Sequence, residues 1–220
     1  AFSIAASIAQ LAVAVLGVLV ITGEYTTGMI RSTLAAVPRR LPALWAKGLV
    51  LAVSIFVVSA FAVVVSLGVM QLFLGSKGLA PDLGKTETIR ILIGTVLYLM
   101  AIALLAFAIG ALLRHSAGAL ATVMGLLLVV PAITAIPWKP LQLIGPFLPG
   151  EAGSKILMAA KTQPTSPDVI GVVLGPWQGY AVLLAWVAVL LTVAAVLLRR
   201  RNAVATTHYR LAGTAGVLKG

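Results

Sequence analysis

The chain has 220 residues, of which 61% are hydrophobic and only 10% are charged, whereas about a quarter of a typical soluble protein is charged. This composition excludes an ordinary water-soluble globule, and the mean hydropathy of +1.12 indicates a polytopic membrane protein. The lack of cysteine excludes disulfides and thiolate metal sites, and two histidines with five acids leave little material for a metal cluster.

Five uncharged stretches are long enough to cross a bilayer, whose hydrocarbon core needs about 20 residues of helix. They are residues 2–22, 48–74, 91–113, 117–136 and 179–198. All five are rich in Leu, Val, Ala and Ile and lack the alternating apolar and polar residues of barrel strands. The sequence therefore predicts an all-α polytopic membrane protein whose 220 residues form a single transmembrane domain.

Basic residues are spread unevenly over the connections between these stretches. One set of segments holds ten lysines and arginines and a single acid: the 24–47 connection, the Arg114-His115 turn and the 199–220 tail. The other two connections together hold six lysines and arginines and four acids. Because cytoplasmic loops carry the positive excess, the first set and the C-terminus are predicted to be cytoplasmic. Topology, not nucleic-acid binding, then explains the net charge of +11. Five spans place Ala1 outside, so we expect one further span before it and six in the complete protein.

Residues 139–168 differ in composition from the rest of the chain. Five prolines surround a short amphipathic run at 151–161. This pattern predicts an external cap of one or two short helices that lies at the membrane surface before the last span.

The sequence lacks two features that would couple a membrane protein to an energy source, namely ionisable residues within the spans and a nucleotide-binding motif. No predicted span contains Asp, Glu, Lys or Arg, whereas carriers driven by ion gradients commonly place ionisable groups at mid-membrane. Gly84-Lys85-Thr86 resembles the end of a phosphate-binding loop, but the first glycine of that motif would fall at Leu79. We therefore expect no nucleotide site in this chain.

Polar residues inside the predicted spans have two interpretations. Most are expected to form hydrogen bonds between helices, worth about 1 kcal/mol or less. Gln10, Gln71 and Tyr98 are the candidates for facing a substrate path.

The first predicted cytoplasmic connection carries an amphipathic pattern over residues 24–40. Drawn as a helix, it places Ile30, Leu34 and Val37 on one stripe, and Pro38 ends the helix. Such a helix either rests on anionic lipid headgroups or docks on a partner protein.

The same connection resembles that of the membrane subunits of type-2 ATP-binding-cassette exporters. The matching residues are Glu24, Gly28, Leu34, Pro38, Arg40 and Lys47. Two further similarities are the internal turn at 110–120 and the short external helices before the last span, so the likeness covers essentially the whole chain. The chain departs from the family at Met29, where members often have threonine, and at 131–134, where they have a Leu-Ser-Gly-like stretch.

The resemblance implies a permease subunit in a bacterial plasma membrane, with the five stretches corresponding to family spans two to six. Its first loop would dock, as a coupling helix, on two copies of a separate ATPase subunit that binds ATP and Mg²⁺. A second permease chain, identical or related, would complete a path that works by alternating access. This chain would have no cofactor and no catalytic residue. The implied coupling interface comprises Glu24, Gly28, Arg31, Leu34, Pro38, Arg39, Arg40, Arg114 and His115.

Two other classes of protein are weighed against the exporter. A secondary carrier or channel without an ATPase partner would need an ionisable or pore-lining constellation that the spans lack. A membrane enzyme would need clustered acids or histidines at one interface, for which Glu24, Arg114 and His115 are the candidates.

The absence of native cysteine allows the orientation to be tested by single-cysteine labelling. Cysteine placed at Ser76 or Ser154 should react with an impermeant thiol reagent in intact cells, and cysteine placed at Ser32 should not. The reverse pattern would overturn both the orientation and the coupling assignment.

Overall fold

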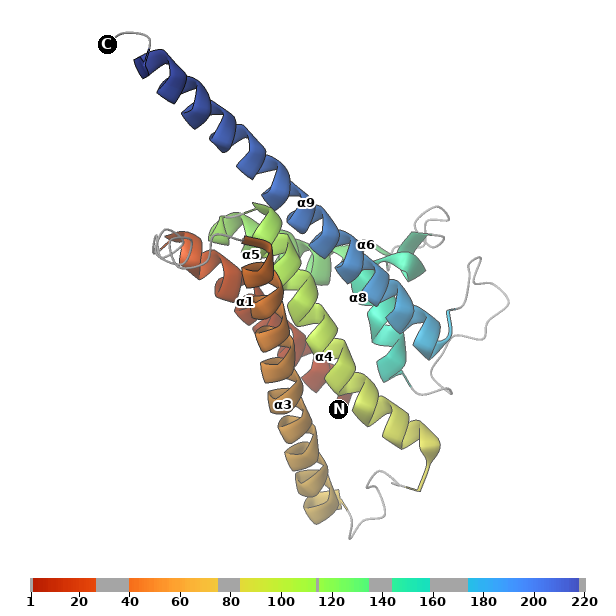
Figure 1. Ribbon diagram of the computed structural model, residues 1–220. Helices are drawn as coiled ribbons and strands as arrows, with labels where there is room; N and C mark the ends of the chain where they lie inside the picture. The colour runs from red at the N-terminus through yellow and green to blue at the C-terminus, as the bar shows by residue number, and fades with distance from the viewer. Residues whose placement is uncertain are drawn as a thin grey trace.

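A computed structural model describes residues 2–26, 40–74, 84–113, 115–134, 144–158 and 174–217. All regular elements in these ranges are helical (Figure 1). The long helices are α1 (Phe2–Thr26), α3 (Arg40–Leu74), α4 (Thr86–Leu113) and α9 (Pro176–Val217). A further rod consists of α5 (Ser116–Met124), η2 (Gly125–Val129) and α6 (Val130–Thr134). The short turns before α9 are η3 (Gly145–Phe147), α8 (Pro149–Ser154) and η4 (Lys155–Leu157).

Four helices are long and apolar enough to cross a membrane. They are Pro42–Phe73, Thr86–Leu113, Ser116–Thr134 and Pro176–Leu197. They match the last four predicted spans, so the all-helical fold with long apolar helices is confirmed, and these helices have the length and composition of a multi-pass membrane protein. The first predicted span lies in α1, where the apolar stretch Ser7–Gly23 is shorter, and the total of five spans therefore remains a prediction.

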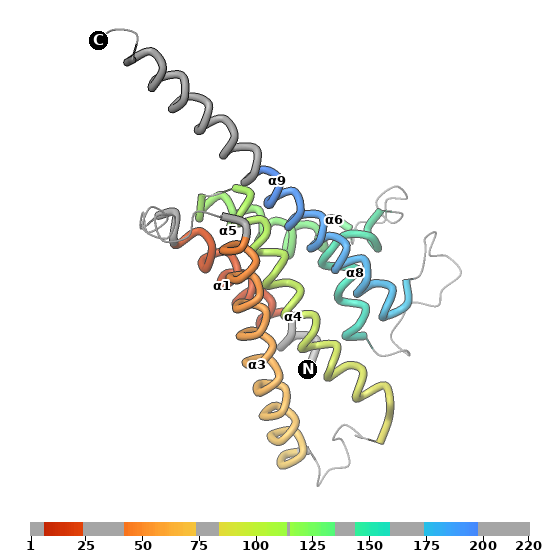
Figure 2. Tube along the Cα trace, viewed as in Figure 1, coloured from red at the N-terminus to blue at the C-terminus, as the bar shows by residue number. Residues whose placement is uncertain are grey.

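Helix α4 is the centre of the bundle and packs against α1, α3, α5 and α9 (Figure 2). Its most apolar window is 72% buried, whereas the other three candidate spans are 28% buried or less. Alanines supply much of this buried surface, and Ala101, Ala103, Ala106 and Ala108 are completely inaccessible to solvent. Small side chains of this kind let neighbouring backbones approach closely on several sides of one helix.

Helices α1 and α4 pack in close contact along their length. A Cβ atom added to Gly17 would lie 2.5 Å from the carbonyl oxygen of Ala103, and one added to Gly110 would lie 2.6 Å from Cγ2 of Ile21. Residue numbers rise together along both contacts, so α1 and α4 run in the same direction. Two membrane helices separated by one intervening span must run this way.

Several helix ends meet at one end of the molecule. The end of α1 at Thr26, the start of α3 at Arg40, the end of α4 at Leu113 and the start of α5 at Ser116 lie together at the upper left in Figure 1. We call this region the α4–α5 end. The 24–47 connection and the Arg114-His115 turn therefore leave the bundle on the same side, as the predicted topology requires.

The rod that follows α4 contains one wide turn. Residues 125–129 form a π-helix, in which the N–H group of Val130 donates to the carbonyl oxygen of Gly125. Pro131 follows at once and has no N–H group to continue the regular ladder. A π turn next to proline is a recognised cause of helix bending, so this rod has a built-in irregularity near its middle.

The segment before α9 confirms the predicted short helices but reaches deeper along the bundle than a cap resting on helix ends. Ala152 and Ile156 are completely buried. A Cβ atom on Gly94 would lie 2.8 Å from Ile156, and one on Gly153 would lie 2.8 Å from the ring of Tyr98. Tyr98 lies about halfway along α4, so α8 and η4 pack beside the middle of the central helix. Glycines at the contacts make this approach possible, because they remove the Cβ atoms that would block it.

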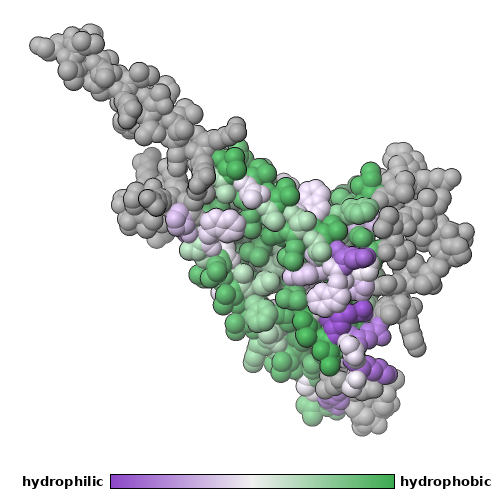
Figure 3. Space-filling model, turned by 45° about the vertical axis from the view of Figure 1, so that its right-hand side comes forward, coloured by the Kyte–Doolittle hydropathy of each residue, from purple (hydrophilic) through white to green (hydrophobic). Residues whose placement is uncertain are grey.

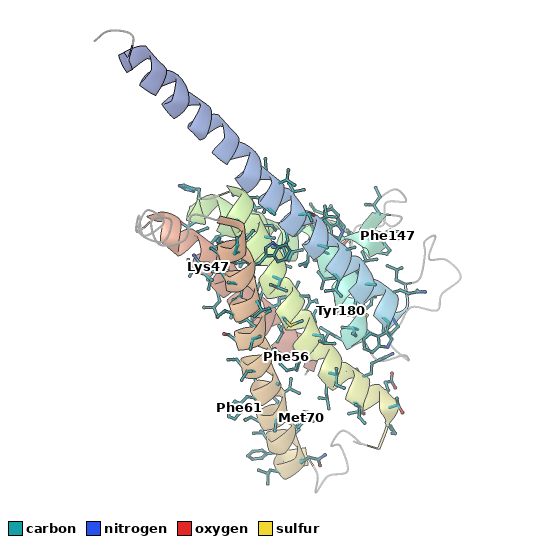
Figure 4. The ribbon with its side chains drawn as sticks, viewed as in Figure 1. Lys47, Phe56, Phe61, Met70, Phe147 and Tyr180 are labelled. Carbon is teal, nitrogen blue, oxygen red and sulfur yellow. The ribbon has the colours of Figure 1, made fainter. Side chains whose placement is uncertain are left out.

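Much of the face of the bundle seen in Figure 3 is strongly apolar, with hydrophilic residues gathered on its right-hand side. Helix α3 shows this most clearly, since no residue from Ala60 to Phe73 is buried in the described chain. Phe61 is 70% exposed and Leu72 is 80% exposed, and Figure 4 shows Phe61 extending away from the bundle. Such a surface suits contact with lipid or with another membrane helix and is incompatible with water.

The close contact between α1 and α4 gives a direct test of the packing. Gly17→Ala should destabilise the bundle by about 1–3 kcal/mol, because the added methyl group would overlap the Ala103 carbonyl group. The measurement is thermal unfolding of the purified protein in detergent. Gly23→Ala in the same helix is the matched control, since nothing lies within 4 Å of its added Cβ atom. Equal melting temperatures for the two variants would contradict this packing.

Candidate functional site

Most residues of the predicted coupling interface lie outside the described part of the chain. These are Gly28, Arg31, Leu34, Pro38, Arg39 and Arg114. Glu24 and Arg40 belong to helices whose backbone is described, in the last turn of α1 and at the first position of α3. The amphipathic helix predicted at 24–40 therefore remains a prediction. Its first and last residues belong to α1 and α3, and the ends of these two helices lie at the α4–α5 end.

His115 is the described member of that interface with a placed side chain. It caps α5, because its backbone is extended and its Nδ1 atom accepts a hydrogen bond of 3.3 Å from the N–H group of Gly118. An accepting Nδ1 requires the neutral imidazole with its proton on Nε2. His115 therefore defines where α4 gives way to α5, and its ring remains exposed at the α4–α5 end.

Two of the three predicted path residues are brought together. The hydroxyl group of Tyr98 donates a hydrogen bond of 2.5 Å to Oε1 of Gln10, which joins α4 to α1. Tyr98 is only 2% exposed, whereas Gln10 is partly exposed. Gln71 does not join them, since it is exposed near the far end of α3.

Helices α8 and α9 also contact α4 near Tyr98. Helix α8 contacts the Tyr98 ring through Gly153, and the hydroxyl group of Tyr180 in α9 lies 3.4 Å from the carbonyl oxygen of Leu97. Figure 4 places Tyr180 between α9 and α4. We call this region the Tyr98 junction and define it by Gln10, Tyr98, Glu151, Gly153 and Tyr180. It combines an amide, two phenols and a carboxylate within an otherwise apolar bundle.

Glu151 is the member of the junction that the sequence did not indicate. It lies in α8, two residues before Gly153, and is partly buried. In the described part of the chain, no lysine or arginine approaches Glu151 within the ion-pair limit of 4.0 Å. The proline-rich composition around it predicted a surface cap, and only Gly153 two residues later hints at close packing.

Arg90 and Trp186 fasten the segment that carries Glu151. The guanidinium group of Arg90 donates a 2.9 Å hydrogen bond to the carbonyl oxygen of Met158 and lies 3.7 Å from the carboxylate of Glu87. The indole N–H group of Trp186 donates a 2.9 Å hydrogen bond to the carbonyl oxygen of Phe147. One side chain from α4 and one from α9 thus hold the two ends of the segment against the bundle.

The chemistry available at the Tyr98 junction is recognition by hydrogen bonds and charge. Within the described residues, no group of three or more acids or histidines could hold a metal ion. The junction itself contains no serine, cysteine or lysine that could act as a nucleophile. Its amide, phenols and carboxylate are the groups that could recognise a ligand in this way.

Comparisons with known proteins find no matching family model and neither a curated protein nor a solved structure that is similar to the chain. The likeness to exporter permeases rests on the motif residues alone. Function must therefore be argued from the arrangement of helices and charges.

The hydrogen bond between Gln10 and Tyr98 can be tested by a double-mutant cycle. Tyr98→Phe and Gln10→Leu each remove one partner, and the two changes together should destabilise the protein by less than the sum of the single changes. The expected coupling is about 0.6–1.7 kcal/mol, the range measured for hydrogen bonds between membrane helices. Chemical unfolding in detergent or bicelles provides the measurement. Simple additivity would show that the two side chains are independent.

Proposed function

We propose that this chain is the permease subunit of an ATP-driven exporter and that it couples to a separate ATPase at the α4–α5 end. The observation that carries the proposal is the convergence of helix ends there. The 24–47 connection and the Arg114-His115 turn are separated by two long helices in sequence, yet both leave the bundle on one side.

Charge supports docking at this end. The connections that leave there, with the C-terminal tail, hold ten basic residues and one acid. Glu24 occupies the last turn of α1 and Arg40 the first turn of α3, so the residues between them are tied to two helices that both contact α4. A force applied to this connection would reach the central helix directly. That is the mechanical property that a coupling segment requires.

The site for cargo in this proposal is the region of the Tyr98 junction. Gln10 and Tyr98 lie on α1 and α4, which pack closely, so a shift between these helices would change the hydrogen bond between them. The irregular rod of α5, η2 and α6 offers a second place where the bundle can bend. Alternating access would combine such shifts with ATP binding and hydrolysis in the partner.

A second permease chain completes the proposed transporter. The exposed apolar surface of α3 and the partial burial of Gln10 leave one chain unable to enclose a polar path by itself. Mass measurement of the solubilised complex should therefore show two permease chains and two ATPase copies.

The coupling proposal is tested with a charge variant at the α4–α5 end. Glu24→Ala combined with Arg40→Glu should abolish co-purification of the ATPase, or reduce substrate-stimulated ATP hydrolysis at least tenfold. Truncating a desolvated charge at an interface typically costs 2 kcal/mol or more, whereas a charge on lipid headgroups contributes about 1 kcal/mol. The measurement is ATP hydrolysis by the complex in lipid nanodiscs.

Lys85→Ala, just before α4 begins, is the control and should leave hydrolysis within about twofold. Both variants must insert and melt like the parent protein. Normal stimulated hydrolysis in the double variant would refute coupling through this connection.

Glu151 favours a second candidate, a secondary carrier. An ionisable side chain beside the middle of α4 could exchange a proton or bind a cation during transport. The two candidates differ in their energy source. Uptake into inverted vesicles that continues without ATP and stops when an ionophore collapses the ion gradients would support the carrier and contradict the exporter.

A further inference from the structure

We propose that α6 is a lid that turns about the π turn at residues 125–129 and closes against η3. The inference concerns a movement within this chain, so it does not depend on whether ATP or an ion gradient supplies the energy. It names the part that moves, the joint about which it moves and the surface against which it closes.

The two halves of the rod formed by α5, η2 and α6 are attached differently. Helix α5 packs against α4 and α1, and Ala119 and Val123 are completely buried in this contact region. Helix α6 has no buried residue in the described part of the chain, and the neighbour it contacts most is η2, the turn before it. One half therefore belongs to the bundle, whereas the other half is held mainly through the turn.

The joint between the halves interrupts the regular ladder of hydrogen bonds. The N–H group of Val130 donates to the carbonyl oxygen of Gly125, so this turn holds one residue more than an α-helical turn. In a regular helix the N–H group of residue 131 would donate to the carbonyl oxygen of Leu127, but Pro131 has no N–H group. A Cβ atom added to Gly125 would meet nothing within 4 Å, so no described neighbour blocks this side of the joint.

Leu127 fixes the position of the joint. Its side chain is buried, and its Cδ2 atom lies 3.8 Å from the place that a Cβ atom on Gly150 of α8 would occupy. Helix α8 in turn contacts the Tyr98 ring through Gly153. A rotation at the joint would therefore turn α6 about a point that rests on α8, the same short helix that packs against α4.

The contact that closes the lid is small. A Cβ atom on Gly145 of η3 would lie 3.3 Å from Cγ2 of Thr134, the last residue of α6. The Thr134 hydroxyl group donates to the carbonyl oxygen of Pro131 at 3.0 Å, so its methyl group is left to make this contact. η3 itself is tied to α9 by the hydrogen bond from Trp186 to the carbonyl oxygen of Phe147. In the described structure, the lid can thus leave η3 by giving up van der Waals contact alone.

Distances between spin labels test the inference, and the lack of native cysteine allows labelling at introduced cysteines. Val53→Cys on the exposed face of α3 is the reference, and Ile133→Cys places the second label on α6. The matched control pair combines Val53→Cys with Thr122→Cys in α5, before the joint. Pulsed electron paramagnetic resonance is recorded on the purified chain in nanodiscs, with an excess of unlabelled chain to suppress distances between copies. The distance distribution should be at least twice as wide for Ile133 as for Thr122.

Two variants remove the joint. Deletion of Leu128, whose side chain is exposed, takes the extra residue out of the π turn and leaves a regular helix. It should narrow the Ile133 distribution to the width of the Thr122 distribution. Pro131→Ala restores the missing N–H group and should narrow the Ile133 distribution by at least a third, which provides a second test if the deletion variant does not fold.

A third variant holds the lid open. Gly145→Leu places a side chain where the Thr134 methyl group lies, so the distance that matches the described structure should disappear from the Ile133 distribution. Gly68→Leu in α3 is the matched control and should leave the distribution unchanged, because nothing lies within 4 Å of its added Cβ atom. All variants must melt like the parent protein.

Three results would overturn the inference. Equal widths for the two pairs in the parent protein would show that α6 is as fixed as α5. A wide Ile133 distribution that persists both without Leu128 and in Pro131→Ala would place the movement elsewhere. An unchanged distribution in Gly145→Leu would refute closure against η3. The measurement needs no ATPase, so these results are independent of the coupling test.

Discussion

The absence of Cβ atoms along α4 and its neighbours is the constraint on which the fold depends. Gly17 and Gly110 bring α1 against α4, Gly94 and Gly153 bring the segment before α9 against the same helix, and Gly179 brings α9 against that segment. Between membrane helices, lipid is as apolar as leucine, so close van der Waals contact has to provide the attraction that the hydrophobic effect provides in water. A single methyl group at these points would separate the backbones and weaken that contact.

This close packing also decides where the polar groups lie. Tyr98 reaches Gln10 because α1 and α4 are in direct contact, and α8 approaches Tyr98 because it carries Gly153 at its contact with the ring. Arg90 and Trp186 then fix both ends of the segment that carries the carboxylate. The Tyr98 junction is consequently a product of backbone approach, and its geometry would respond to any movement of α1 relative to α4.

The two regions suggested for function occupy different parts of the same helix. His115 marks the α4–α5 end of the central helix, and Tyr98 lies about halfway along it. Motion at the proposed coupling connection can therefore reach the proposed cargo site through one continuous rigid element, without a chain of intermediate side chains. The π turn before Pro131 offers a local bend in the rod that contacts both α4 and α8. These features favour a transporter in which binding and coupling are separated along α4.

The sequence by itself determined the helical membrane class, because long uncharged stretches have no other stable state in a bilayer. Four of its predicted spans are apolar helices in the structure, and its basic connections leave the bundle on one side, whereas the coupling segment itself lies outside the described residues. Gln10 and Tyr98 were recognisable as polar residues in apolar stretches, but nothing local showed that they pair or that Gln71 stays apart. Only the tertiary structure decided that the segment carrying Glu151 packs beside the middle of α4, because that placement depends on separate close contacts at Gly94, Gly153 and Gly179, which are far apart in the sequence.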